Sequence, residues 1–383
     1  MGRARGAGQL PDGRQLNAAS ATGAASAAGP GTHPGAEILS RLTLSRGTVD
    51  RSAHRRTDAA WLDAAWADPR TRVLVIDDGR ALVRFGDAGA DLVLVPSGQA
   101  PDGLRFLLGV DDDGVVYFGV LGPLPERAEH AWADGPGAGT EREAPGGAAA
   151  DLPAAAGTAG TVVAAAGDGS GGRPSVRPAG LRSVGELLGD RDAGLMTHAV
   201  ALANWHEVST HCSRCGAETQ PHSSGHARRC PVDGSDHFPR LDPAVIMLVT
   251  DPADRCLLAR NAAWPERRVS ILAGFVEPGE SAEHAVAREV QEETGIEVAP
   301  GQVEYLASQP WPMPHSLMLG FRVRATGQLD IEVDREEIAE ARWYSRDELR
   351  AAIGSGELLL PPPVSIAHRI IEDWYGEDLP GSW

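Results

Sequence analysis

Residues 274–296 read GFVEPGESAEHAVAREVQEETGI, and this stretch decides how the rest of the chain is interpreted. Gly274 and Gly279 allow a tight turn, and Ser281 is of a residue type that caps the start of a helix. The stretch therefore predicts a loop followed by a helix over residues 282–294. Gly295 would end that helix, because glycine best tolerates a left-handed terminus.

Three glutamates, Glu289, Glu292 and Glu293, have the i, i+3, i+4 spacing that places side chains on one helix face. Carboxylates crowded in this way repel one another, and Arg288 alone is too little to compensate them. Oxygen ligands suit a hard divalent cation, Mg²⁺ or Mn²⁺, which also binds phosphate oxygens. The alternative, a solvated acidic face, is the commoner meaning of a charge run. The glycines, Glu280 and Arg288 around the glutamates favour the metal site.

The same stretch resembles the Nudix box, G-x5-E-x7-R-E-U-x-E-E-x-G-U with U aliphatic, at every specified position. The resemblance implies a Nudix hydrolase, which uses Mg²⁺ or Mn²⁺ to cleave a nucleoside diphosphate linked to another group. Apolar, strand-like segments precede and follow the box, and helical segments follow at 346–352 and 365–375. The expected fold class is therefore α/β (α+β), a Nudix α/β/α sandwich with a mixed sheet.

Composition limits the function classes that fit the chain. Its 383 residues allow two or three domains, and its formal net charge of −18 argues against broad attachment to nucleic acid or anionic membrane. No window approaches 18 uninterrupted apolar residues, and the N-terminus lacks an apolar core, so no membrane span or secretory signal is expected. Three of the four cysteines have metal-ligand spacing, which favours a reducing, cytoplasmic location.

Changes in composition divide the chain into six parts. Residues 1–36 and 126–178 have few large apolar side chains, and we expect a disordered tail and a low-complexity linker or insertion there. Residues 37–125 predict a β-rich domain without a chemical motif, which a scaffold or dimerisation role would explain. Residues 179–210 predict a helical connection, 211–240 a zinc ribbon and 241–383 the catalytic domain.

The ribbon is predicted from Cys212 and Cys215, followed after a gap by Cys230 and Asp233. Two CxxC turns with this spacing bind one tetrahedral Zn²⁺, but here an aspartate occupies the fourth place. Asp233 itself, or His237 or His226 instead, would complete the site; alternatively, the metal is weakly held or lost. We favour bound zinc, because so short a hairpin has little core without it.

A second motif, SQPWPMPHS at residues 308–316, follows the box. Its three prolines predict a stiff, extended loop between two strands, and Trp311 could pack against a flat ring. The motif, the ribbon and Pro361 with its two following prolines resemble the NADH pyrophosphatases (NAD⁺ diphosphatases) over residues 181–380. This resemblance implies an N-terminal Nudix-like domain, a zinc ribbon, a catalytic Nudix domain and a homodimer.

The resemblance also assigns roles to single residues. The backbone carbonyl of Ala273 and the carboxylates of Glu289, Glu293 and Glu337 would bind the catalytic metal, with Glu292 a ligand or the base that activates water. Arg288 would orient these carboxylates. The implied substrate-binding positions are Phe238, Phe275, Gln309, Pro310, Trp311, Pro312, Met313, Pro314, His315, Ser316 and Ala367. Phe238 stands where family members often carry tyrosine, so a hydroxyl contact would be missing.

Three functions compete on this basis. The leading hypothesis is hydrolysis of the pyrophosphate bond of NAD(H), giving AMP and nicotinamide mononucleotide, with NADH preferred. The second is removal of the NAD cap from RNA 5′ ends by the same chemistry; a basic groove would favour it, and Arg228, Arg229 and Arg240 are the hint of one. The third is a non-catalytic nucleotide sensor or scaffold, which the intact box disfavours.

Overall fold

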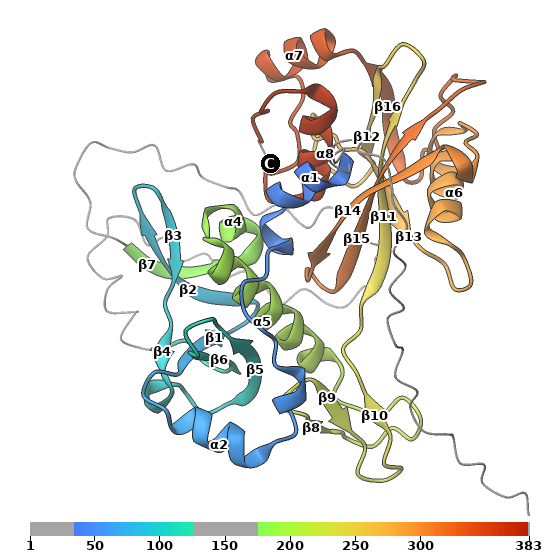
Figure 1. The fold of residues 1–383 in the computed structure, drawn as a ribbon. Coiled ribbons are helices and arrows are strands. Elements are labelled where there is room, and N and C mark those ends of the chain that lie inside the picture. The colour runs from blue at the N-terminus through green and yellow to red at the C-terminus, as the bar shows by residue number, and fades with distance from the viewer. Residues whose placement is uncertain (1–33, 126–174, 382–383) are drawn as a thin grey trace, which may run out of the picture. The chain divides into compact units, whose positions relative to one another are not determined.

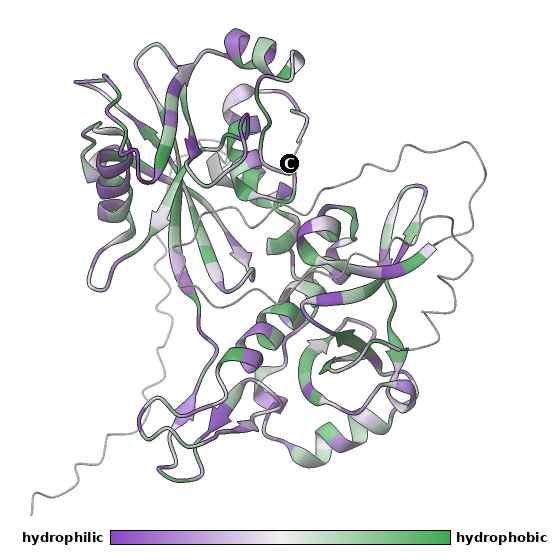
Figure 2. Ribbon diagram, turned by 180° about the vertical axis from the view of Figure 1, so that it is seen from behind, coloured by the Kyte–Doolittle hydropathy of each residue, from purple (hydrophilic) through white to green (hydrophobic). Residues whose placement is uncertain are grey.

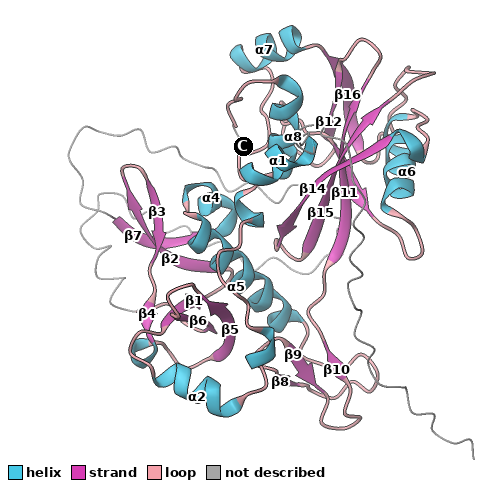
Figure 3. Cartoon of the chain, in the orientation of Figure 1, coloured by secondary structure: helices cyan, strands magenta, loops and turns pink. Residues whose placement is uncertain are grey.

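The computed structural model describes residues 34–125 and 175–381 (Figure 1). The tail and linker expected within residues 1–33 and 126–174 lie outside this part of the chain. The described residues form a mixed α/β structure, as predicted (Figure 3). None of their helices is both long and apolar enough to cross a lipid bilayer.

The N-terminal part is rich in strands, which confirms the expectation for it. It contains helices α1 (Pro34–Arg41) and α2 (Ala59–Ala67) and two small sheets with the strand orders β4-β1-β6-β5 and β3-β2-β7. The strands are β1 (Arg72–Ile76), β2 (Arg80–Gly86), β3 (Gly89–Leu92), β4 (Val95–Pro96), β5 (Leu104–Val110), β6 (Val116–Leu121) and β7 (Ser175–Gly180). β1 and β6 pair in parallel, and the other pairs are antiparallel.

Two elements begin earlier than composition suggested. Helix α1 starts at Pro34, inside the expected tail, and strand β7 starts at Ser175, inside the expected linker. The segment SVRPAG has weak strand character of its own, with a proline and a glycine among six residues. It becomes a strand because β2 pairs with it along its whole length, from Arg80 opposite Gly180 to Phe85 opposite Ser175.

The helical connection consists of two helices, α4 (Leu181–Val184) and α5 (Asp190–Val208). The chain bends between them through Gly185 and Gly189. A Cβ at Gly185 would lie 2.8 Å from Cγ2 of Val364, so the bend is packed closely against the C-terminal part of the fold. After α5, three short antiparallel strands form the ribbon: β8 (Gln220–His222), β9 (Ala227–Arg229) and β10 (Asp236–His237).

The C-terminal part is built on one mixed sheet with the order β14-β15-β11-β12-β16, to which β13 is added on β11. Its strands are β11 (Asp242–Thr250), β12 (Cys256–Asn261), β13 (Leu272–Phe275), β14 (Val303–Trp311), β15 (Ser316–Arg324) and β16 (Ile338–Tyr344). Its helices are α6 (Ala282–Thr294), α7 (Arg346–Gly354) and α8 (Ile366–Tyr375). β11 and β15 are parallel over nine residue pairs.

Alternate residues of β11 enter two different cores. Val245 and Met247 pack in a core with Val286 and Val290 of α6, whereas Ile246 and Leu248 pack in a core that includes α8. The sheet therefore lies between α6 and α8, which confirms the α/β/α sandwich (Figure 1). Figure 2 shows hydrophobic residues along the sheet and a largely hydrophilic α6, as expected for a helix with one face in solvent.

Candidate active site

Residues 274–296 form the predicted loop and helix. Ser281 caps α6 by accepting a hydrogen bond from the His284 N–H at 3.3 Å, and Gly295 ends the helix in the left-handed conformation at φ 72°. Helix α6 spans residues 282–294, as the sequence indicated. This geometry points Glu289 and Glu293 inward, where both are buried, and leaves Glu292 exposed.

Gly274 is required by the space that Glu289 occupies. A Cβ at position 274 would lie 1.9 Å from Cδ of Glu289 and 2.0 Å from its Oε1. Strand β13 and helix α6 therefore approach so closely at this point that the carboxylate lies directly over the glycine backbone. The first glycine of the box is explained by this approach and not by a turn.

Arg288 joins the acidic residues of the box. Its Nε and Nη2 donate to both oxygens of Glu280 at 3.0 Å, and its Nη1 donates to Glu289 at 2.8 Å and to Glu292 at 2.9 Å. Nη2 also donates to the carbonyl of Phe275 at 2.8 Å. The hydrogen bonds that Arg288 donates to Glu280, above all, raise the pKa of Arg288. The arginine thus ties the loop to the helix and fixes two carboxylates, with the planar fork that lysine lacks.

Of Glu289, Glu292 and Glu293, Glu293 is the one that Arg288 does not reach. Its side chain is 7% exposed, and its Oε2 has no hydrogen-bond partner among the described residues. Burial, above all, together with the nearby charges of Glu289, Glu337 and Glu292, raises the pKa of Glu293 to about 8. Burial also raises the pKa of Glu289.

This cluster fits a divalent cation. A buried carboxylate oxygen without a partner is costly unless a positive group comes within reach. Among the described residues Arg288 is the cation placed in the cluster, and its donors are directed at Glu280, Glu289 and Glu292. The remaining oxygens are the ligand type that Mg²⁺ and Mn²⁺ prefer. Ala273 lies next to Gly274 in β13, and Glu337 is exposed on the loop before β16.

The proline motif is a hairpin and not a loop, which corrects the expectation. β14 continues through Pro310 to Trp311, and β15 begins at Ser316, so residues 312–315 alone form the turn. Proline is tolerated there because β14 is the edge strand of the sheet. After a register shift between Tyr305 and Ala307, the two strands stay paired up to the turn, with Trp311 opposite Ser316.

Three side chains of this hairpin, Gln309, Trp311 and Ser316, are buried. Gln309 is fully buried, donates to the Val364 carbonyl at 2.8 Å and accepts from the Ile366 N–H at 2.7 Å, so both of its ends hold the segment that enters α8. Trp311 is 9% exposed and Ser316 7%. His315 pairs with Asp242 at 3.0 Å.

The other positions expected to bind substrate differ in how far their side chains are exposed. Phe238 is 70% exposed, Phe275 is half-buried on β13, and Ala367 is buried at the start of α8. Met313 packs against the core. Pro310, Pro312 and Pro314 belong to the hairpin and its turn.

Two neighbours of the hairpin were not predicted. The guanidinium of Arg182 lies 5.5 Å from the centroid of the Trp311 ring, and Asn204 donates to the Pro312 carbonyl at 2.8 Å. Both residues lie on the helical connection more than 100 positions earlier in the chain, and no sequence signal joins them to the motif.

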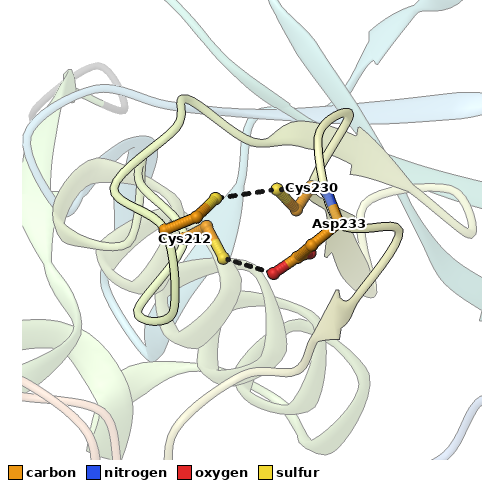
Figure 4. A group of neighbouring side chains, drawn as sticks. Cys212, Cys230 and Asp233 are labelled. Atoms are coloured by element: carbon orange, nitrogen blue, oxygen red, sulfur yellow. Dashed lines mark hydrogen bonds between the residues drawn. The ribbon is translucent and has the colours of Figure 1, made fainter. Parts of the chain in front are cut away.

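The ribbon brings Cys212, Cys215, Cys230 and Asp233 together, with their ligand atoms within 4.8 Å of one another. Cys215 and Cys230 sulfurs are 3.5 Å apart, and Cys212 Sγ lies 3.5 Å from an Asp233 oxygen (Figure 4). Zinc–sulfur bonds of ~2.3 Å at tetrahedral angles place neighbouring ligand atoms about 3.8 Å apart. Of the two histidine alternatives, neither belongs to this group; His226 contacts the Leu107 carbonyl at 2.7 Å instead.

Asp233 takes the place of a fourth cysteine in a repeated turn. Gly216 N–H donates to the Cys212 carbonyl at 2.9 Å, and Gly234 N–H donates to the Cys230 carbonyl at 3.0 Å. The two glycines have φ of 73° and 72°. The turns are thus equivalent, and hydrogen bonds from Ser235 lower the pKa of Asp233 and hold it as a carboxylate.

Comparison with known proteins agrees with both sites. The NUDIX domain family matches residues 240–360, and the NADH pyrophosphatase zinc ribbon domain matches residues 209–238. The C-terminal part of the chain is thus similar to a Nudix domain, and the segment before it is similar to the zinc ribbon domain of NADH pyrophosphatases. These domains make a divalent cation and a structural zinc the cofactors of the chain.

Several relatives are named for their substrate. The NAD-capped RNA hydrolase NudC of Mycobacterium bovis (strain BCG / Pasteur 1173P2) is 49% identical over 202 residues, which cover 51% of this chain and 64% of the relative. The human NAD-capped RNA hydrolase NUDT12 is 40% identical over 199 residues, 49% of this chain and 42% of the relative. The chain thus spans less than two thirds of their lengths. A NUDIX hydrolase structure from Nitrosomonas europaea is 21% identical with a TM-score of 0.33, covering 44% of this chain and 94% of that one.

Proposed function

We propose that this protein hydrolyses the pyrophosphate bond of NAD(H) and releases AMP and nicotinamide mononucleotide. The observation that carries the proposal is the buried Glu293 carboxylate, left without a partner beside an Arg288 that orients its neighbours. A scaffold protein would have no reason to keep this costly arrangement. The NADH pyrophosphatase type of the ribbon supports the choice of substrate.

In this proposal Glu289, Glu293, Glu337 and the Ala273 carbonyl hold the divalent cation. When bound, the cation neutralises the pyrophosphate charge and makes water more acidic. Glu292 is exposed at the rim, with 60% of its side chain accessible, and accepts the proton of the attacking water or serves as a further ligand. Water forms a new bond to one phosphorus, and the bond from that phosphorus to the bridging oxygen breaks.

The hairpin would form one wall of the substrate site. Because Gln309 and Trp311 are buried, we assign the specificity of this wall to its shape and backbone rather than to free polar side chains. Phe275 and Phe238 are the more accessible aromatic residues and would pack against flat rings. Replacing Phe275 by alanine should therefore raise the KM for NADH more than it lowers kcat.

Removal of the NAD cap from RNA is the second candidate, because the relatives carry that name. The three arginines that hinted at a basic groove all have partners within the protein. Arg228 is buried and donates to Thr219 and His206, while Arg229 and Arg240 pair with Asp236 and Asp242. The small dinucleotide is therefore the substrate that we place first.

The test is a hydrolysis panel with Mg²⁺ or Mn²⁺, in which NADH, NAD⁺, ADP-ribose and an NAD-capped RNA are compared at equal concentration. We expect AMP and reduced nicotinamide mononucleotide from NADH at the highest kcat/KM. A marked preference for capped RNA would make decapping the main role. Intact dinucleotides with either metal would contradict the enzymatic proposal.

We also propose that Cys212, Cys215, Cys230 and Asp233 bind the zinc, that the protein acts in the cytoplasm, and that it forms a homodimer. Free thiols support the first two, since these cysteines are ligands only when reduced. The dimer follows from the resemblance to NADH pyrophosphatases. Light scattering at micromolar concentration tests it, and a monomer mass would contradict it.

A further inference from the structure

A cavity of about 370 Å³ lies in the N-terminal part, outside the Nudix box. It is lined by residues at the start of β1, on β2 and β6, in the connection from β3 to β4, and in the first turn of α5. Its volume falls within the range of ~300–1,000 Å³ that is typical of small-molecule sites. None of the lining residues belongs to the Nudix box or to the ribbon.

Every charged side chain that lines this cavity, among the described residues, is an arginine: Arg70, Arg72, Arg84 and Arg191. Four guanidinium groups around one cavity are unexpected in a chain with 53 acidic and 35 basic side chains. The rest of the lining is Tyr117 and apolar residues such as Leu94. The cavity therefore combines a positive rim with an apolar wall.

Carboxylates behind the lining compensate some of this charge. Arg70 pairs with Asp68 at 3.0 Å, and Arg191 pairs with Asp192 at 2.9 Å. Arg72 and Arg84, in contrast, form no ion pair with a carboxylate anywhere in residues 34–125 or 175–381. Asp91 lies opposite Arg84 in the β2–β3 register but forms no ion pair with it, so neither guanidinium is engaged by a carboxylate among the described residues.

Arg72 is also held in place. Its Nη1 donates to the carbonyls of Pro69, Arg70 and Thr71 at 3.0 Å each, which fixes the guanidinium at the cavity edge. Among the described residues these hydrogen bonds involve Nη1, so Nε and Nη2 stay available for a ligand. A guanidinium fixed in this way binds phosphate oxygens in a fork-like pair and loses little conformational freedom in doing so.

We propose that this cavity binds a mononucleotide, with its phosphate on Arg72 and Arg84 and its base or sugar against the apolar wall. Phosphate fits the four arginines, and the cavity volume fits a small molecule. A long polyanion such as RNA fits less well, because the net charge of −18 repels it over longer distances. The site is additional to the proposed hydrolysis and does not depend on it.

The probe is 5′-AMP, titrated calorimetrically into the full chain at about 150 mM salt without added Mg²⁺, with adenosine as the phosphate-free control. Arg84→Gln and the double variant Arg72→Gln/Arg84→Gln remove the unpaired charges. Arg80→Gln is the matched control, because Arg80 lies on the same strand and does not line the cavity. Glu293→Gln is titrated in parallel to separate this site from the Nudix site.

We expect Arg84→Gln to weaken AMP binding at least about tenfold, the double variant to weaken it further, and Arg80→Gln and Glu293→Gln to leave it unchanged. Adenosine should not bind. The proposal is overturned if AMP affinity is the same in Arg84→Gln, or if Arg80→Gln weakens it equally. Binding of a ten-nucleotide RNA without binding of AMP would also overturn it. Unaltered zinc content and melting temperature show that each variant is folded.

Discussion

The two metal regions of this chain treat their acidic groups in opposite ways. In the ribbon, Asp233 accepts two hydrogen bonds from Ser235, and the turn amides of Arg214 and Asp233 face the sulfurs of Cys212 and Cys230. In the Nudix box, Glu293 is buried with an oxygen that has no partner in the described residues. In the ribbon the acidic group has its hydrogen-bond partners before metal binds. In the Nudix box the buried carboxylate oxygen gains a partner when metal binds. This difference separates a structural site from a catalytic one.

Glu293→Gln gives the largest expected effect. It removes a carboxylate that we propose as a metal ligand, so kcat for NADH should fall at least about a hundredfold, while the metal-free protein should be as stable as the parent or more stable, because a buried carboxyl with an unpaired oxygen is costly. Activity and thermal unfolding are measured with Glu283→Gln as control, since Glu283 is exposed in the first turn of the same helix. Near-parental activity in Glu293→Gln would remove this residue from the metal site.

Cys230→Ala should have the next largest effect, on the other region. The protein should purify without zinc and unfold at a lower temperature, because the ribbon has three strands of two or three residues and little core of its own. Zinc is measured by elemental analysis. Asp233→Cys should keep a full equivalent, and Asp236→Ala, on the same hairpin, is the control. A full equivalent of zinc in Cys230→Ala would contradict the ligand assignment.

Gly274→Ala tests the close approach in the box. Its new Cβ would meet Glu289, which must move away from the cluster, so we expect at least a tenfold loss of kcat and a cost of about 1–3 kcal/mol in unfolding free energy. Gly301→Ala is the control, because nothing lies within 4 Å of a Cβ there. Equal kcat in both variants would show that Glu289 is free to shift without loss.

Acid should affect the ribbon through the histidines packed beside it. Burial lowers the pKa of His206 and of His226 to about 4. Both histidines bind protons more readily in the unfolded chain. Their contribution to the free energy of unfolding is therefore complete above the ordinary histidine pKa of about 6.5, and it is lost as the pH falls from there towards 4. Each should contribute a loss of at most about 2 kcal/mol between pH 7 and 5.

Urea unfolding of the parent and of His226→Gln at pH 7 and pH 5 measures this loss. The variant should lose less unfolding free energy on acidification, and zinc release is common to both proteins and cancels in the comparison. Identical losses in the two proteins would exclude His226 as the source.

The parts of the fold that sequence predicted are those set by local signals. Ser281 and Gly295 define both ends of α6, and the apolar run of β11 is a strand buried on both faces. The parts it missed depend on distant partners. β7 is a strand because β2 lies beside it, and Gln309 serves the entry to α8 because Val364 and Ile366 are within reach. No periodicity within either segment carries that information.

The parallel pairing of β11 with β15 has a consequence for how the chain is made. Asp242 pairs with Ser316, 74 positions later, and at ~5–20 residues per second the ribosome needs about 4–15 s to supply that partner. During this interval the most apolar strand of the sheet has an open edge, which is a point of aggregation in newly made proteins. The order of synthesis therefore supplies the ribbon and most of the N-terminal part before the sheet of β11 can close.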